Sequence, residues 1–257
     1  MVFWGTGLED GLRQAARLGF DAVELWTSHL EKENHLSTGE LARLLHEAGL
    51  ACTIHAPIRD INIASANGGI RRESTSQMID SVNLCADLGA ELVVVHPGRL
   101  SSRHSNPEVH WEYQIAAYRE VLAAAADRGV VVTTENMEWE KKDELVRTPQ
   151  EVRRLQTALP EYRLPVTLDL THLGETERVL EAIDVLADDI AHVHVSDCGP
   201  PLHIPLGEGR LDLKRIFREL QSGGFSGILS FEIYMPPGTS SSLEKEKAKL
   251  VGLIERS

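Results

Sequence analysis

The sequence predicts an α/β protein built as a single (β/α)8 TIM barrel that spans residues 1–257. Eight short apolar runs rich in Val and Ile recur along the chain, and segments of helical pattern separate them. The runs are nearly continuous rather than alternating, which is typical of parallel strands that are buried on both faces. The alternative is a doubly wound open sheet, which we disfavour because no GxGxxG or Walker sequence follows the first run. A length of 257 residues is usual for such a barrel.

The expected strands are short and lie at regular intervals. In chain order they cover residues 2–5, 22–25, 51–55, 92–96, 130–135, 165–169, 191–195 and 228–233. The expected helices cover 8–18, a segment from Ser37 or Thr38 to 48, 71–88, 107–128, a segment that opens at Thr148 and Pro149, and 212–220. The residues at the ends of these helices are typical helix caps. Ser, Thr or Asp precedes several of the helices, and a Gly such as Gly49, Gly89 or Gly129 follows them.

The composition limits which partners and which cellular compartment we expect for the protein. The formal net charge is −13 and no basic stripe is present, which disfavours nucleic acid as a partner. The three cysteines, Cys52, Cys85 and Cys198, are widely spaced, so we expect reduced thiols in a cytoplasmic protein. No apolar run approaches the ~18 residues of a membrane helix, and the first residues lack the features of a signal peptide. We therefore expect no membrane partner, and the sequence leaves an oligomer open.

Polar side chains stand where a barrel of this kind carries its site, at the carboxyl ends of the strands. Seven of the eight expected strands end in or carry a His, Asp or Glu. These residues are Glu24, His55, His96, Glu135, Asp169 with His172 shortly after it, His192, His194 and Glu232. Burying such groups costs free energy unless they are paired or bind a metal. Imidazole and carboxylate ligands without Cys predict a divalent metal cofactor (Mn, Zn, Co, Fe, Ni or Mg) and argue against a structural thiolate zinc site.

Not every histidine belongs to this set. His192 and His194 lie two positions apart on one expected strand, so both side chains can point into the barrel. His194 is nearer the carboxyl end and is the better ligand, whereas we expect His192 to be a deeper core residue. Five further histidines fall in expected loops or helices, and we interpret them as surface residues: His29, His35, His46, His104 and His110.

Seven short motifs follow one another on the expected strands and on the loops after them. They are HAPI at 55–58, HPG at 96–98, EN at 135–136, DLTH at 169–172, HVHVSD at 192–197, LGEGRLD at 206–212 and SFE at 230–232. Taken in this order over essentially the whole chain, they resemble the xylose-isomerase-like TIM barrel superfamily. That superfamily contains sugar and sugar-phosphate isomerases and epimerases, and it also contains the apurinic-site endonuclease IV family.

The resemblance implies metal ligands. In the isomerase and epimerase branch one metal is held by residues that match Glu135, Asp169, His194 and Glu232. In the endonuclease branch a further ion is held by residues that match His55, His96 and Glu135, and a third ion receives His172 and His203. The sequence departs from that branch at Pro201, where an aspartate is expected, and at 56–59, where bulky DNA-entering residues are absent. The segment DINIASANGGIRRES at 60–74 nevertheless resembles the endonuclease branch more closely.

We interpret the chain as a metal-dependent isomerase or epimerase of a small polyhydroxy carbonyl compound, either a sugar or a sugar phosphate. Glu135 and Glu232 are the expected catalytic pair: one removes the proton beside the carbonyl, through an enediolate, and the other returns it. His172 is the third expected catalytic residue and donates a hydrogen bond to a substrate oxygen. The residues expected to contact the substrate are His55, His203, Asn136, Arg210 and Glu24.

Two alternatives stay open. The histidines His55, His96, His172 and His203 exceed what a one-metal isomerase needs, so the chain is alternatively a multinuclear metal-dependent phosphoesterase related to the endonuclease family. The other hypothesis is non-enzymatic, a metal-dependent sugar-binding or regulatory barrel. The number of metal ions per chain separates the two enzymes, since one ion favours the isomerase and several favour the phosphoesterase.

Overall fold

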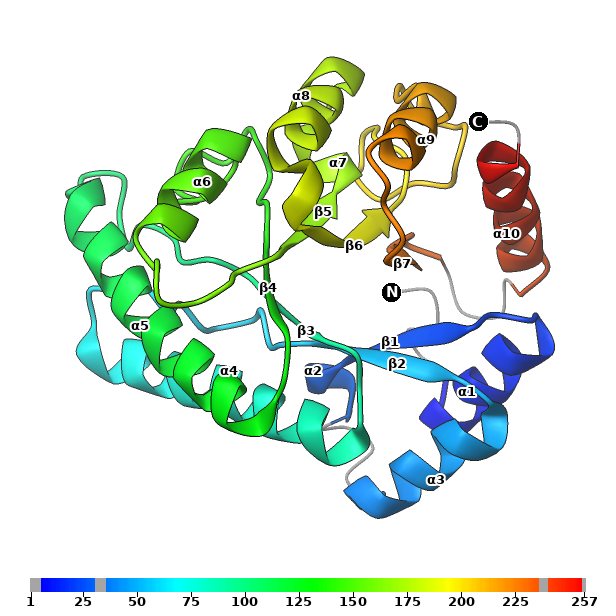
Figure 1. Ribbon diagram of the computed structural model, residues 1–257, viewed down its shortest axis with the longest axis horizontal. Coiled ribbons are helices and arrows are strands. Elements are labelled where there is room, and N and C mark those ends of the chain that lie inside the picture. Colours follow the sequence, from blue (N-terminus) through cyan, green and yellow to red (C-terminus); the bar gives the residue numbers. More distant parts are fainter. Residues whose placement is uncertain (1–5, 31–35, 236–239, 256–257) are drawn as a thin grey trace.

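The computed structural model describes residues 6–30, 36–235 and 240–255. Within them, seven parallel strands form one sheet in sequential order, which curves into a nearly closed barrel with the helices outside it (Figure 1). The strands are β1 Ala22–Trp26, β2 Ala51–His55, β3 Val93–Val95, β4 Val132–Glu135, β5 Val166–Asp169, β6 Ile190–Val195 and β7 Ile228–Phe231. They confirm the predicted TIM barrel fold, and the expected strand at 2–5 lies outside the described residues.

The helices cover the outer face of the sheet (Figure 1). They are α1 Leu8–Arg17, α2 Thr27–Leu30, α3 Thr38–Ala48, α4 Gly68–Leu88, α5 Pro107–Arg128, α6 Pro149–Thr157, α7 Leu170–Leu173, α8 Thr176–Leu186, the short 3₁₀ helix η2 Ala187–Asp189, α9 Leu213–Ser222 and α10 Ser240–Ile254. Helix α4 begins earlier than predicted because the side chain of Asn67 accepts hydrogen bonds from the amides of Gly69 and Ile70. None of the helices in the described ranges is long and apolar enough to cross a membrane. The three cysteines are buried free thiols.

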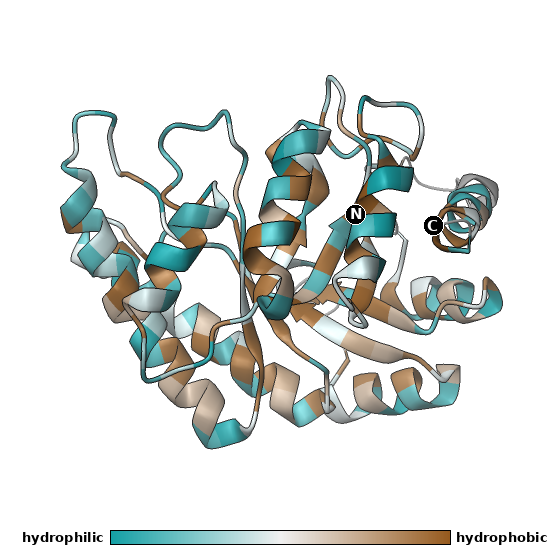
Figure 2. Cartoon of the chain, turned by 45° about the horizontal axis from the view of Figure 1, so that its top comes forward, coloured by the Kyte–Doolittle hydropathy of each residue, from teal (hydrophilic) through white to brown (hydrophobic). Residues whose placement is uncertain are grey.

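The strands face two environments, although their sequences are nearly continuous apolar runs. One set of side chains, such as Ile54, points outward and belongs to the apolar clusters that the helices cover. The other set points into the barrel, where polar contacts join neighbouring strands. Thr133 Oγ1 lies 2.6 Å from Thr167 Oγ1, and Thr53 Oγ1 donates to Glu24 Oε2 over 3.3 Å. Figure 2 shows mostly brown strands between helices of mixed colour, and the buried apolar clusters join residues of the strands to residues of the helices.

Hydrogen bonds and a β-bridge join the three loops that follow β2, β3 and β4 at the carboxyl end of the barrel. The side chain of Asn62 bonds both backbone groups of Arg99, because its Oδ1 accepts from the amide over 3.1 Å and its Nδ2 donates to the carbonyl over 2.8 Å. Arg99 in turn forms an antiparallel bridge with Glu144. His110 packs against the same region, with Nδ1 2.6 Å from the carbonyl oxygen of Ala64 and only 3% of the residue exposed. The prediction that His110 is a surface residue is wrong, because α5 turns it toward the 60–74 loop.

Glu144 is a buried carboxyl group at this junction, and its burial gives a pH-dependent stability. Its exposed fraction is 9%, and burial raises its pKa to about 7 although the charge of Arg99 opposes the rise. An ordinary Glu ionises near pH 4.5, so between pH 4.5 and 7 the folded state binds more protons than the unfolded state. Stability therefore falls as the pH rises through this window and stays low above it.

We expect Glu144→Gln to have a larger free energy of unfolding than the wild type at pH 8, by up to about 3 kcal/mol. At pH 4.5 the advantage should be small, because the carboxyl group is then protonated in the folded state. Urea unfolding of both proteins at the two pH values measures the effect, and the exposed Glu120→Gln is the control. A difference that does not change with pH would contradict this explanation.

Candidate metal centre

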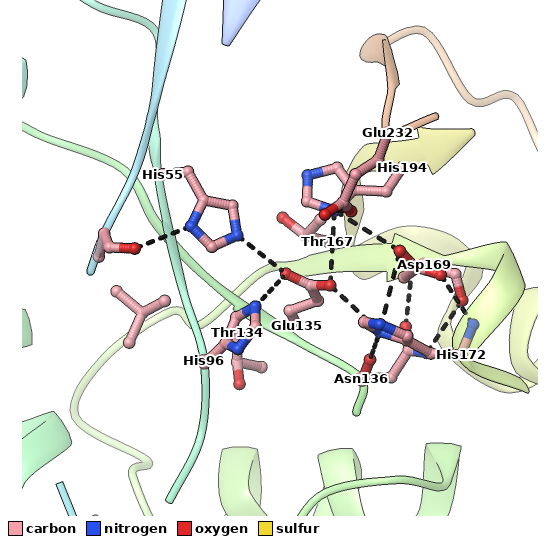
Figure 3. Close-up of polar contacts among 12 residues, drawn as sticks. His55, His96, Thr134, Glu135, Asn136, Thr167, Asp169, His172, His194 and Glu232 are labelled. Carbon is pink, nitrogen blue, oxygen red and sulfur yellow. Dashed lines mark hydrogen bonds and ion pairs between the residues drawn. The ribbon is translucent and has the colours of Figure 1, made fainter. Parts of the chain in front are cut away.

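Four side chains from four strands meet at the carboxyl end of the barrel. Glu135 ends β4, Asp169 ends β5, His194 lies in β6 and Glu232 directly follows β7. Parallel pairing brings these positions to one level, and Asp169 is the direct register partner of His194. One donor atom of each residue lies within 4.8 Å of the others, and Figure 3 shows the four side chains turned toward one another. All four are buried, and Glu232 is the most exposed at 8%.

The atoms that face one another here form ion-pair contacts but no hydrogen bonds within the described residues. His194 Nδ1 lies 2.9 Å from Glu232 Oε2 and 3.4 Å from Glu135 Oε1. Within the described residues no hydrogen bond reaches Glu135 Oε1, Glu135 Oε2, Asp169 Oδ2, His194 Nδ1 or Glu232 Oε2. Buried polar atoms without partners are rare in folded proteins and cost free energy. Three carboxylates and one imidazole are a donor set that a divalent cation satisfies, so these residues fit the predicted cofactor.

A second group of donors shares Glu135 with the first. His55 ends β2 and His96 follows β3, and their Nε2 atoms lie 3.5 Å and 3.1 Å from Glu135 Oε2. His55 Nδ1 lies 2.8 Å from the carbonyl oxygen of Ala56, so Nδ1 carries a proton and Nε2 is the atom that faces the carboxylate. The ring centroids of Trp26 and His55 lie 5.0 Å apart, so the indole packs against the imidazole. His55, His96 and Glu135 therefore form a second candidate metal site.

A third group is built around Asp169. His172 Nδ1 lies 2.9 Å from the carbonyl oxygen of Asn136 and 3.8 Å from Asp169 Oδ2, and its ring centre lies 5.2 Å from that of His203. His203 has a φ of 59°, in the left-handed region that residues other than Gly seldom adopt. The group offers one carboxylate and two imidazoles, and Pro201 stands at the position where the resemblance to the endonuclease branch implies an aspartate.

Two polar side chains shape these groups through the backbone. Asn136 bonds both backbone groups of Asp169, since its Nδ2 donates to the carbonyl over 3.0 Å and its Oδ1 accepts from the amide over 2.9 Å. Asp197, which follows β6, holds the loop that carries His203 and Arg210. Its carboxylate accepts hydrogen bonds from the amides of Cys198, Gly207, Gly209 and Leu211. Sequence reasoning missed Asp197, although the HVHVSD motif contained a signal: a carboxylate directly after a buried strand needs donors.

The remaining predicted residues, Arg210 and Glu24, are not among the four donors of the centre, although Glu24 contacts His194 and forms a further donor group with His192 and His194. Arg210 is exposed, and its Nε donates to the carbonyl oxygen of Gly174 over 2.6 Å. Glu24 and His192 lie inside the barrel, where Glu24 Oε2 is 2.6 Å from His192 Nε2. His192 is 0% exposed, so its predicted core position is confirmed. Of the histidines predicted at the surface besides His110, His46 and His104 are exposed, His29 is half-buried and His35 lies outside the described residues.

The charges of the centre are shared between carboxylates and imidazoles. Burial lowers the pKa of His172, but the carboxylates of Asp169 and Glu135 outweigh burial and raise it to about 10. Burial raises the pKa of Asp169 to about 6, against the opposing charge of His172. Burial also raises the pKa of Glu135, yet the imidazoles of His96 and His194 bring it well below its usual range. Imidazolium protons thus neutralise the carboxylates, and a divalent cation competes with these protons.

The fold and the centre define a class of protein, a (β/α)8 barrel that gathers His and carboxylate donors at the carboxyl ends of its strands. The chain belongs to the family of xylose isomerase-like TIM barrels, whose sequence profile matches residues 12–251. This match confirms the resemblance that the seven motifs indicated.

The curated relatives include sugar epimerases and probable endonucleases. The chain is 24% identical over 244 residues to the D-psicose 3-epimerase of Ruminiclostridium cellulolyticum, a match that covers 91% of this chain and 81% of that one. It is 24% identical over 225 residues to the probable endonuclease 4 of Mycobacterium bovis, with 84% and 86% covered. Among solved structures, a D-tagatose 3-epimerase-like protein superposes with a TM-score of 0.83 at 24% identity, over 97% of this chain and 94% of that chain. This superposition supports the barrel fold.

Proposed function

We propose that the protein is a divalent-metal-dependent epimerase or isomerase that acts on a small sugar or sugar phosphate. The observation that carries the proposal is a pair of buried carboxylates, Glu135 and Glu232, that both approach Nδ1 of His194 within a donor set suited to one cation. Two carboxylates on different strands suit the removal of a proton from one face of a carbon and its return to the other. The D-psicose 3-epimerase among the relatives supports a ketose as the class of substrate.

Each residue of the centre has a role in this proposal. The cation would be held by Glu135, Asp169, His194 and Glu232. When bound, it supplies a Lewis acid that stabilises negative charge on the substrate oxygens. Glu135 and Glu232 take up and return the proton beside the carbonyl, and the pKa of each lies below the ordinary Glu value because nearby imidazoles outweigh burial. His172, whose Nδ1 is held by the carbonyl of Asn136, donates a hydrogen bond to a substrate oxygen.

The test of this function is proton exchange at the reacting carbon. The metal-loaded protein is incubated in D₂O with a panel of ketoses and ketose phosphates, and the sugars are followed by proton NMR. We expect deuterium at the carbon beside the carbonyl and the appearance of a second sugar. A protein that binds one cation tightly yet exchanges no proton of any ketose or ketose phosphate would contradict the proposal.

A second candidate function is favoured by the two additional donor groups. These are His55 with His96 and Glu135, and Asp169 with His172 and His203. Together with the endonuclease 4 relative, they support a multinuclear phosphoesterase as the alternative, in which water attacks a phosphoester at several metal ions. The formal net charge of −13 opposes a nucleic acid substrate, and Pro201 leaves the third group with one carboxylate fewer.

Replacing His96 by Ala separates the two functions. His96 belongs to the second donor group and not to the four-residue centre, so the epimerase proposal expects His96→Ala to keep one cation per chain. Turnover of the sugar should then fall by no more than about 10–100-fold, the cost of losing a contact that supports a ligand. Elemental analysis of dialysed protein and the deuterium assay measure both quantities, with the exposed His104→Ala as the control. A wild-type protein with two or more cations, one of which is lost in His96→Ala, would favour the phosphoesterase.

A further inference from the structure

One buried carboxylate lies outside the donor set but contacts its histidine. Glu24 of β1 points into the barrel, and its side chain is 7% exposed. Its Oε1 lies 3.1 Å from Nε2 of His194, and its Oε2 lies 3.2 Å from the same nitrogen. Nε2 of His192 lies 2.6 Å from Oε2, and Thr53 Oγ1 donates to Oε2 over 3.3 Å. The pairing of Glu24 with Thr53, two residues before His55, places this carboxylate one level deeper than the centre.

The contact with Glu24 determines which nitrogen of His194 carries a proton. An ionised carboxylate accepts hydrogen bonds and donates none, so Nε2 of His194 must supply the proton that the two groups share. The opposite nitrogen, Nδ1, is the one that faces the carboxylates of the centre, at 2.9 Å from Glu232 Oε2. Histidines that bind metals generally donate their second N–H to a carboxylate or a carbonyl, which fixes the tautomer and the ring orientation. Glu24 and His194 have this arrangement.

The neighbouring histidines show how Glu24 differs from an ordinary acceptor. His55 and His172 direct Nδ1 to the backbone carbonyls of Ala56 and Asn136, at 2.8 Å and 2.9 Å. His194 instead faces a charged carboxylate, and hydrogen bonds to a charged acceptor are stronger than those to a neutral one. The stronger bond makes the imidazole of His194 a better electron donor at Nδ1.

We propose that Glu24 is a positioning residue of the metal centre: it holds Nε2–H of His194, aims Nδ1 at the cation and strengthens cation binding. Hydrogen bonds with His192 and Thr53 hold the carboxylate of Glu24 in place. This inference rests on the proposed metal centre, and it places Glu24 in support of a ligand rather than in contact with the substrate. Glu24 Oε2 is hydrogen-bonded to His192 Nε2 over 2.6 Å, whereas the facing atoms of the four-residue centre have no hydrogen bond within the described residues. This difference favours a supporting role for Glu24 over a separate metal site formed by Glu24, His192 and His194.

Glu24→Gln tests the strength of the effect. The variant keeps the size of the side chain and removes its charge, so we expect the Kd for Zn²⁺ to rise by about 10–100-fold with one ion per chain still bound. Competition with a fluorescent zinc chelator on the apoprotein measures the Kd. The matched control is Glu246→Gln, because Glu246 is also a buried carboxylate, at 4% exposed, but it accepts hydrogen bonds from the amide of Leu206 and from Lys249 rather than from a histidine of the centre. An unchanged Kd in folded Glu24→Gln would overturn the inference.

The main result of a second measurement comes from the wild-type protein and does not depend on how the variant folds. In protein labelled with ¹⁵N-histidine and loaded with ¹¹³Cd²⁺, NMR should show Nε2 of His194 protonated and Nδ1 coupled to cadmium. In Glu24→Gln the Nε2 proton should exchange faster with solvent. Coupling of cadmium to Nε2 of His194 and to His192 would overturn the inference, because Glu24, His192 and His194 would then be a metal site themselves.

Asp169→Asn distinguishes a failure of this inference from a failure of the proposed centre. If Asp169→Asn weakens Zn²⁺ binding and Glu24→Gln changes neither the Kd nor the ¹⁵N spectrum, the centre is supported and the role of Glu24 is wrong. If neither variant affects Zn²⁺ binding, the proposed centre is wrong and the inference falls with it.

Discussion

Turnover of the Glu135→Gln variant is expected to fall by about 10²–10⁴-fold at saturating metal, and Glu232→Gln is expected to behave alike. An amide cannot take up the proton that the reaction moves, and positioned acid–base groups contribute about 10²–10⁴-fold to such a step. Glu135 also belongs to two of the donor groups, and its loss removes a charge from both. Initial rates of sugar interconversion give the comparison, with the bound metal quantified in the same samples so that lost metal is not mistaken for lost proton transfer.

The two glutamine variants also test whether the carboxylates act on opposite faces of the carbon. Each variant keeps one carboxylate, so one of the two epimers should still exchange its proton with D₂O although inversion is lost. Which epimer exchanges should differ between Glu135→Gln and Glu232→Gln. The exposed Glu120→Gln should match the wild type in both assays. Full turnover in either glutamine variant at full metal content would exclude the two-carboxylate mechanism.

The meeting of the four central donors could be predicted because it depends on topology alone. Parallel strands of a barrel place their carboxyl ends on one face. Glu135, Asp169 and His194 each end or nearly end an apolar run, and Glu232 lies in the last of them. Once the runs are interpreted as parallel strands, these side chains share one rim whatever the details of packing, and the structure brings them together.

The supporting contacts could not be predicted, because they depend on register and on where loops fold back. The sequence shows Asn136 as a polar neighbour of Glu135, yet its amide bonds the backbone of Asp169, 33 positions later. Glu24 is predicted to contact the substrate, and only the structure shows that its carboxylate instead contacts His192 and His194 of β6. His110 has helical neighbours typical of a surface, and it is buried only because the loop at Ala64 folds over it. The periodicity of apolar residues along the sequence does not reveal such contacts.

Asp169→Asn is expected to weaken metal binding by more than the roughly 10–100-fold that losing a supporting contact costs, since it removes a ligand outright. The two oxygens of Asp169 have different partners. Oδ1 accepts a hydrogen bond from the amide of His172 over 2.8 Å and caps α7, whereas Oδ2 is buried without a hydrogen bond and lies 3.8 Å from Nδ1 of His194. Asparagine keeps an oxygen for the cap and loses the charge and the second oxygen. The loop should therefore stay folded while the metal ligand is lost.

Thermal unfolding with and without metal tests this separation of cap and ligand. A metal that binds only the folded state stabilises it by about 2.7 kcal/mol at 100 times its Kd, which for a chain of this size raises Tm by about 5–10 °C. At the same concentration a variant that binds 100-fold more weakly gains about 0.4 kcal/mol, so its Tm should hardly change. Glu120→Gln should show the full wild-type shift. A full shift in Asp169→Asn would mean that the metal binds elsewhere, and that the carboxylates around Nδ1 of His194 are neutralised by protonated imidazoles instead.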